Sequence, residues 1–184
     1  MKRFVSKLQS LDLRTLIVTF PFIACLHEFE EWNILQWHRT YQTNVPPDIT
    51  NLDLRTIFLI INLVIILWTV LALLPGNNLR VTAYLFFPLL AVSLINALEH
   101  LIWQVEFGVY APGFIFGFIF EAPLILLIAY RMLKDKLVSK LYSGLFGLVV
   151  AAGTVKLLLQ GSEIDPVIVY IMKLSRPIAD FIWK

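Results

Sequence analysis

Five long runs of apolar residues constrain this chain more than any other feature of its sequence. They cover residues 13–32, 57–74, 81–103, 114–133 and 141–159. A helix of about 20 predominantly apolar residues is long enough to cross the hydrocarbon core of a bilayer. The sequence therefore predicts an all-α fold, a polytopic membrane helix bundle with about five transmembrane helices.

The composition agrees with a membrane protein of one domain. Hydrophobic residues make up 59% of the chain and charged residues 15%, whereas soluble domains average about 45–50% and about 25%. Five spans leave no room for a second globular unit, so we expect residues 1–184 to form a single membrane-embedded helical domain. The apolar tail 166–184 contains Lys173, Arg176 and Asp180, which favours a C-terminal interfacial helix over a sixth span.

Charge and cysteine content exclude several classes of protein. The net charge is only +2 and the basic residues are scattered, so we expect the lipid bilayer as a partner and no nucleic acid. Cys25 is the only cysteine of the chain. A single thiol excludes an internal disulfide and a zinc site built from several thiolates.

The distribution of lysine and arginine predicts how the chain is oriented in the membrane. Basic residues concentrate around the start of the first run and between the fourth and fifth runs, at Lys2, Arg3, Lys7, Arg14, Arg131, Lys134, Lys136 and Lys140. Such an excess marks the cytoplasmic side, so we expect a cytoplasmic amino terminus. No small-residue cleavage site follows the basic start, so we expect the first run to be retained. The small polytopic design suits a bacterial inner membrane.

Ionisable and amide side chains gather inside three of the apolar runs, where they are costly. A charged residue near the centre of a membrane helix costs about 2.5–3.5 kcal/mol on insertion scales, so such residues usually mark functional sites. They are His27, Glu30 and Glu31 in the first run, Asn96, Glu99 and His100 in the third, and Glu121 in the fourth. Residues three or four apart share a helix face. This spacing puts the three residues of the first run on one face and turns Glu28 away from it.

Depth in the membrane gives an independent reason to group these residues. At a rise of about 1.5 Å per residue, His27 lies about 8 Å inside the end of its helix, and Asn96 and His100 lie about 5–10 Å inside theirs. Glu121 enters from the same side and lies about 12 Å from the turn near Gly113. We therefore expect all seven residues at one level, near the non-cytoplasmic interface.

The motifs in the first and third runs resemble those of a known family. Residues 27–31 read H-E-F-E-E, an H-x-x-E-E motif, and residues 96–100 read N-A-L-E-H, an N-x-x-x-H motif. Both match the motifs of the HXXEE family of small integral membrane proteins, and the resemblance covers most of the chain. It implies that the motif residues are functional, but it supplies no reaction, because no activity is established for the family.

The expected group of side chains favours a metal-dependent enzyme. Two imidazoles with several carboxylates are typical ligands of a divalent metal, here zinc or alternatively iron or manganese. The candidate metal ligands are His27, Glu30, Glu31, His100 and Glu121, and the candidate catalytic residues are Glu30, Glu31, Asn96 and Glu99. In this hypothesis a glutamate is the general base for a water molecule and Asn96 orients the substrate. The preferred reaction is hydrolysis of a lipophilic or membrane-associated substrate.

Other hypotheses use the same residues. A metal-free hydrolase would be similar to the membrane-embedded prenyl-protein proteases, although Leu35 stands where their E-E-x-x-x-R pattern needs arginine. A di-iron oxidoreductase has the same number of histidine and glutamate ligands, but its usual Glu-x-x-His order is absent. Transport of a divalent cation or of protons is a third hypothesis, and a subunit that packs through its polar face is a fourth. His38, in the polar loop 33–55, is expected to be exposed.

Overall fold

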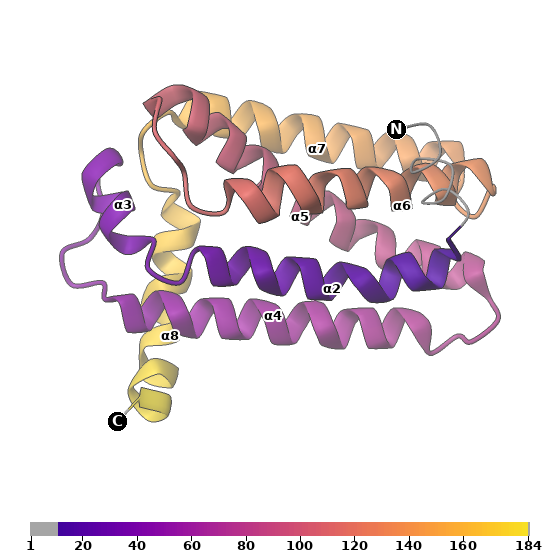
Figure 1. The fold of residues 1–184 in the computed structure, drawn as a ribbon, viewed down its shortest axis with the longest axis horizontal. Coiled ribbons are helices and arrows are strands. Elements are labelled where there is room, and N and C mark those ends of the chain that lie inside the picture. Colours follow the sequence, from indigo (N-terminus) through magenta and orange to yellow (C-terminus); the bar gives the residue numbers. More distant parts are fainter. Residues whose placement is uncertain (1–10, 184) are drawn as a thin grey trace.

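The chain is helical throughout most of the part that the structure describes, which is residues 11–183 of a computed structural model (Figure 1). The helices are α2 (Leu13–Glu30), α3 (Leu35–Tyr41), α4 (Asn51–Leu73), α5 (Leu79–Phe107), α6 (Ala122–Lys134), α7 (Lys140–Gln160) and α8 (Pro166–Trp183). A π-helix, η1 (Phe114–Glu121), runs without a break into α6. The prediction of an all-α membrane bundle is confirmed.

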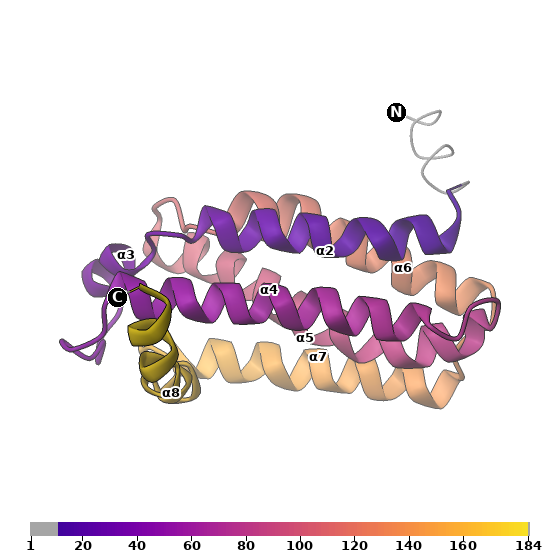
Figure 2. The ribbon, with the colours of Figure 1, turned by 90° about the horizontal axis from the view of Figure 1, so that it is seen from below.

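Within residues 11–183, four helical segments are long and apolar enough to cross a membrane: α4, α5, η1 continued by α6, and α7. The first expected span corresponds to α2, which has 18 residues but includes Arg14, Glu28 and Glu30. α2 is not one of the four, yet it runs along the bundle beside α4 (Figure 1, Figure 2). The length and composition of these helices mark the chain as an integral membrane protein.

α8 lies across one end of the bundle, at a steep angle to the helices that run along it (Figure 1, Figure 2). It is tied to the start of α4 at two points. Nη1 of Arg176 donates to Oδ2 of Asp48 at 2.9 Å, and Nε1 of Trp183 donates to Oγ1 of Thr56 at 2.9 Å. A transverse helix that is apolar with a few charges is the arrangement expected of the predicted interfacial helix.

Polar residues decide where α4 begins. The helix starts at Asn51 rather than at residue 57, where the apolar run begins. Oγ1 of Thr50 accepts the N–H of Asp53 at 3.3 Å, and Oδ2 of Asp53 accepts the N–H of Thr50 at 2.8 Å. This capping box satisfies backbone donors that the first turn would otherwise leave free. The expected loop 33–55 also contains α3, a helix that the apolar pattern did not predict.

Prolines act differently in different spans. Pro21 and Pro88 lie inside α2 and α5 without ending them, as membrane helices allow. Pro123 stands at the start of α6, directly after η1. It has no N–H to donate to the preceding turn, and the wide turns end there: the N–H of Ala122 donates to the carbonyl of Gly117, five residues back.

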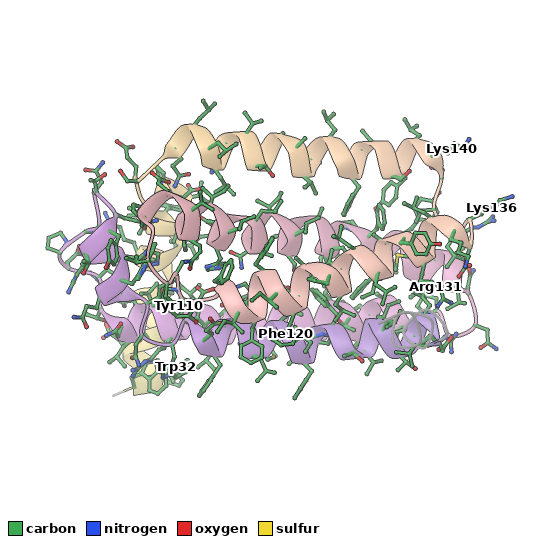
Figure 3. All side chains as sticks on the ribbon, turned by 45° about the horizontal axis from the view of Figure 1, so that its top comes forward. Trp32, Tyr110, Phe120, Arg131, Lys136 and Lys140 are labelled. Carbon is green, nitrogen blue, oxygen red and sulfur yellow. The ribbon has the colours of Figure 1, made fainter. Side chains whose placement is uncertain are left out.

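The two ends of the bundle differ in their polar residues. Figure 3 shows Arg131, Lys136 and Lys140 at one end, and Tyr110 and Trp32 toward the other. α2 begins at the basic end and finishes at the end that α3 and α8 cover (Figure 1). The basic residues at positions 2, 3 and 7, on which the expected orientation partly rests, lie outside the described residues.

Candidate metal centre

Four buried side chains meet where α2 ends. Nδ1 of His27 lies 2.7 Å from Oε2 of Glu121, and Nε2 of the same ring lies 2.9 Å from Oε1 of Glu31. Nε2 of His100, on α5, lies 2.9 Å from the same oxygen of Glu31. The two imidazole rings meet edge to face, with centroids 4.8 Å apart. These four residues are called the His/Glu cluster below.

Glu121 holds one side of the His27 ring. Oε2 of Glu121 lies 2.7 Å from Nδ1 of His27, and the opposite ring nitrogen, Nε2, faces Glu31. Histidines that bind metals in proteins are commonly oriented in this way, by a carboxylate on the nitrogen that faces away from the ion.

Three residues of the His/Glu cluster converge without hydrogen bonds among their facing atoms. One ligand atom from each of His27, Glu31 and His100 lies within 4.8 Å of the other two. Both Nε2 atoms are 2.9 Å from Oε1 of Glu31, yet these three atoms have no hydrogen-bond partner, since neither contact has in-line N–H···O geometry. Buried polar atoms are nearly always paired. Among the described residues, these three therefore form a group that could hold a metal ion.

Two glycines allow the η1 backbone to approach the cluster. A Cβ on Gly117 would lie 2.8 Å from both Cε1 and Nε2 of His27. A Cβ on Gly113 would lie 2.4 Å from Cε1 of His100, and the φ angle of Gly113 is 87°, a conformation that favours glycine. A side chain at either position would force the cluster residues or the η1 backbone to move. The G-x-x-x-G spacing ahead of Glu121 is the signal in the sequence that could have predicted this close approach of the η1 backbone.

Glu30 does not face the cluster, contrary to expectation, but holds the start of η1. Its Oε1 accepts the N–H of Ile115 at 3.2 Å, and its Oε2 accepts the N–H of Phe116 at 2.8 Å. The hydroxyl of Tyr110 also donates to Oε1. Burial and this hydrogen bond raise the pKa of Tyr110 above its ordinary value. A carboxylate at a helix N-terminus satisfies free N–H groups, so Glu30 positions the η1 backbone.

A cavity of about 410 Å³ adjoins the His/Glu cluster, and all four cluster residues line it. Most of its remaining wall is apolar and comes from α4, α5 and α8. Its other polar lining residues are Glu28, His38, Ser93, Asn96 and Glu99. The cluster is therefore open on one side to a space large enough for a small ligand.

Glu28 corrects the expected assignment of helix faces. It was expected to be turned away from the site, but it is only 6% exposed and lines the cavity. At about 100° per residue, positions 28 and 30 flank the face shared by His27 and Glu31 by equal angles on opposite sides. Spacing alone therefore could not show that Glu28 lines the cavity and that Glu30 points away from it.

His38 corrects a second prediction, because it is buried rather than exposed. Its side chain is 5% exposed and lines the cavity. Nδ1 lies 2.6 Å from Oε1 of Gln42, and the ring meets Trp103 edge to face at 5.5 Å. Burial lowers the pKa of His38 below its ordinary value. The third histidine of the chain therefore belongs to the cavity wall but not to the cluster.

Asn96 and Glu99 line the cavity beside the cluster. Glu99 is buried and Asn96 is half-buried, and neither side chain forms a hydrogen bond with another described residue. Of the seven residues expected at one level, four thus form the cluster, two line the adjoining cavity, and Glu30 lies at the start of η1.

Comparison with known proteins gives a family for this arrangement. The model of the family described as "protein of unknown function with HXXEE motif" matches residues 18–128, more than half of the chain. The chain belongs to this family. The matched part of this HXXEE protein contains the whole His/Glu cluster and excludes α7 and α8. No curated protein and no solved structure matches the chain.

Proposed function

We propose that this HXXEE protein is a membrane-embedded, metal-dependent hydrolase that acts on a lipophilic substrate. The observation that carries the proposal is the convergence of His27, Glu31 and His100 on one point at the edge of a largely apolar cavity. Two histidines and one glutamate are the protein ligands of several catalytic zinc sites, which keep a further position for water or substrate.

The two contacts of Glu31 with the histidines are compatible with a bound ion. Ligands about 2.0–2.1 Å from zinc lie about 2.9–3.4 Å apart for angles between a right angle and a tetrahedral one. The two contacts with Oε1 of Glu31 measure 2.9 Å. A cation also offsets the cost of burying several carboxylates together. The proposed ligands are therefore His27, Glu31 and His100, with Glu121 orienting His27.

The remaining polar residues of the cavity supply the roles that hydrolysis requires. When bound, the ion provides Lewis-acid activation of water and of a carbonyl group. Glu99 accepts a proton as water adds to the carbonyl carbon, and returns it to the leaving oxygen or nitrogen as that bond breaks. The amide of Asn96 donates to the substrate and holds it against the cluster. Glu28 is the alternative proton acceptor, and comparing E99Q with E28Q distinguishes the two.

Metal analysis of the purified protein, freed of any histidine tag, tests the proposal directly. We expect about one zinc ion per chain in the wild type and loss of most of it in both His27→Ala and His100→Ala. The chain has three histidines, so His38→Ala is a matched control that should keep the ion. A wild type without stoichiometric metal, or equal metal content in all three variants, would refute the metal site.

Iron in place of zinc would change the class of reaction. Two histidines and one carboxylate are also the facial triad of non-haem Fe(II) oxygenases. An iron content that follows His27 and His100, together with oxygen consumption, would identify an oxidoreductase. The zinc hydrolase is preferred because the cavity also holds the carboxylates Glu28 and Glu99 as general bases.

The proposal includes an orientation, with the cluster near the non-cytoplasmic face of a bacterial inner membrane. The basic residues at the opposite end of the bundle support it (Figure 3). A reporter enzyme fused after Lys184 should then be active outside the cytoplasm. Activity of that fusion in the cytoplasm would contradict the assigned side.

A further inference from the structure

We infer that the cavity receives an uncharged single-chain amphiphile, an acyl ester or amide, directly from the hydrocarbon layer through a mouth between α4, α5 and α8. This inference deepens the proposed function by naming the class of substrate and its route. It rests on that function only in treating the His/Glu cluster as the reactive end of the cavity.

The mouth is identified by the residues that line the cavity and are also exposed. They are Ile60, Ile61 and Val64 of α4, Val92 of α5 and Ile171 of α8, with exposed fractions of 36%, 37%, 49%, 65% and 44%. All five are aliphatic. An opening bordered only by aliphatic side chains on the outside of a membrane helix bundle faces lipid chains rather than water.

The height of the mouth supports the same conclusion. Ile61 lies near the middle of α4 (Asn51–Leu73), about 15–18 Å from either end at the rise of an α-helix. Val92 lies near the middle of α5 (Leu79–Phe107), about 20 Å from either end. Both positions fall within the hydrocarbon core of a bilayer that these helices span.

The route from the water-facing end is covered by α8. Its residues Ile168, Ile171 and Met172 line the cavity, and Met172 is fully buried. The hydrogen bonds of Arg176 and Trp183 hold α8 against the start of α4. The side of the bundle is therefore the open approach to the cavity.

Polarity changes along the cavity in one direction, from the mouth to the His/Glu cluster. Val92, Asn96 and His100 are four residues apart on α5 and all line the cavity, so they form one line along that helix. It runs from an aliphatic side chain through an amide to an imidazole. A ligand that follows it has an apolar chain at the mouth and a polar group beside Asn96 and the cluster.

Charge and size narrow the ligand further. No lysine or arginine is among the described residues that line the cavity, so the cavity lacks the side chains that usually pair with an anionic head group such as a phosphate. The volume of about 410 Å³ is near the lower end of the range for ligand pockets. These properties favour one chain and an uncharged carbonyl group over a two-chain phospholipid.

Fluorescence quenching of Trp103, which lines the cavity, tests the inference. The probe is methyl 4-bromododecanoate, whose bromine lies near the carbonyl group and so near Trp103, which contacts His100. It is added to the protein in bilayer nanodiscs, and subtracting the quenching of a W103F variant isolates the signal of Trp103. We expect saturable quenching of Trp103 that becomes about tenfold weaker in the double variant Ile61→Phe, Val92→Phe, because two phenyl rings would narrow the mouth. Leu148→Phe is the matched control, since Leu148 is exposed on α7 and lies outside the cavity.

The outcomes separate this inference from the proposed function. Equal quenching in the mouth variant and in the Leu148→Phe control would overturn the lateral route. Equal or stronger quenching by 4-bromododecyl phosphate would overturn the uncharged head group. Metal content is measured on the same samples and should not change in the mouth variant. Quenching as expected in a protein without metal would support the ligand and route while refuting the metalloenzyme.

Discussion

Gly117 offers the sharpest test of the proposed metal centre, because replacing it changes the site through a single methyl group. The Cβ of Gly117→Ala would lie 2.8 Å from Cε1 and Nε2 of His27. Ordinary contacts of this kind begin near 3.4 Å, so the imidazole or the η1 backbone must move by about 0.6 Å, which a closely packed interior resists. His27 has little freedom to yield, because Nδ1 is held 2.7 Å from Oε2 of Glu121.

The size of the effect follows from this displacement. Inserting a methyl group into a packed site costs about 1–3 kcal/mol of stability. Disturbing the groups that orient a metal ligand lowers metal affinity by about 10–100-fold. We therefore expect Gly117→Ala to lower both the thermal unfolding temperature and the affinity for zinc. Gly117 is a better probe than Gly113, whose φ of 87° would add backbone strain to the effect.

Competition with a chromophoric zinc chelator measures the affinity, and thermal unfolding in detergent measures the stability. The matched control is Gly147→Ala on α7, where a Cβ meets nothing within 4 Å. Alanine is the better helix former by about 1 kcal/mol, so this control should keep full metal affinity and lose no stability. A Gly117→Ala protein that matches this control in both measurements would refute the close approach of η1 to His27.

Three further predictions concern the residues around the cluster. Glu30→Gln should lower stability by about 1–2 kcal/mol, because a carboxylate that accepts two backbone N–H groups is lost. The variant should retain bound metal. Loss of the metal would contradict the role of Glu30 in positioning the η1 backbone. Glu121→Gln should weaken zinc binding by about 10–100-fold, and unchanged affinity would exclude Glu121 as the group that orients His27. Burial lowers the pKa of His38, so at low pH His38 takes up a proton more readily in the unfolded state than in the folded state. The free energy of unfolding therefore decreases as the pH falls below about 6.5, the ordinary pKa of histidine. The wild type should therefore lose more stability than His38→Phe between pH 7.5 and 5.5, as measured by thermal unfolding, and equal losses would contradict the burial of His38.

The position of the spans and the core of the cluster could be predicted from the sequence. Apolar runs of membrane length are a strong signal, and each predicted run falls on a helix of the structure. His27 and Glu31 are four residues apart on one face, as are Asn96 and His100, which makes their common direction independent of the rest of the fold. The depth of Glu121 in its span predicts the same level as the other residues, and in the structure Glu121 contacts His27.

The parts that could not be predicted depend on contacts between elements. The H-x-x-E-E motif leaves Glu28 and Glu30 at equal angles from the shared face, and the neighbouring η1 backbone decides which of them it engages. The π-helical hydrogen bonding of η1 has no signal in an apolar run. His38 lies in a polar segment, and its burial follows from packing of α3 against Trp103.

Under the proposed function, the position of α8 assigns the chemistry and the selectivity for ligands to different parts of the chain. The family match ends at residue 128, so it includes the His/Glu cluster, whereas α8 begins at Pro166 and closes the end of the cavity. A helix outside the matched residues therefore borders the cavity beside the cluster. Under the proposed function, replacing this C-terminal segment would change which chains are accepted while leaving the proposed metal ligands in place.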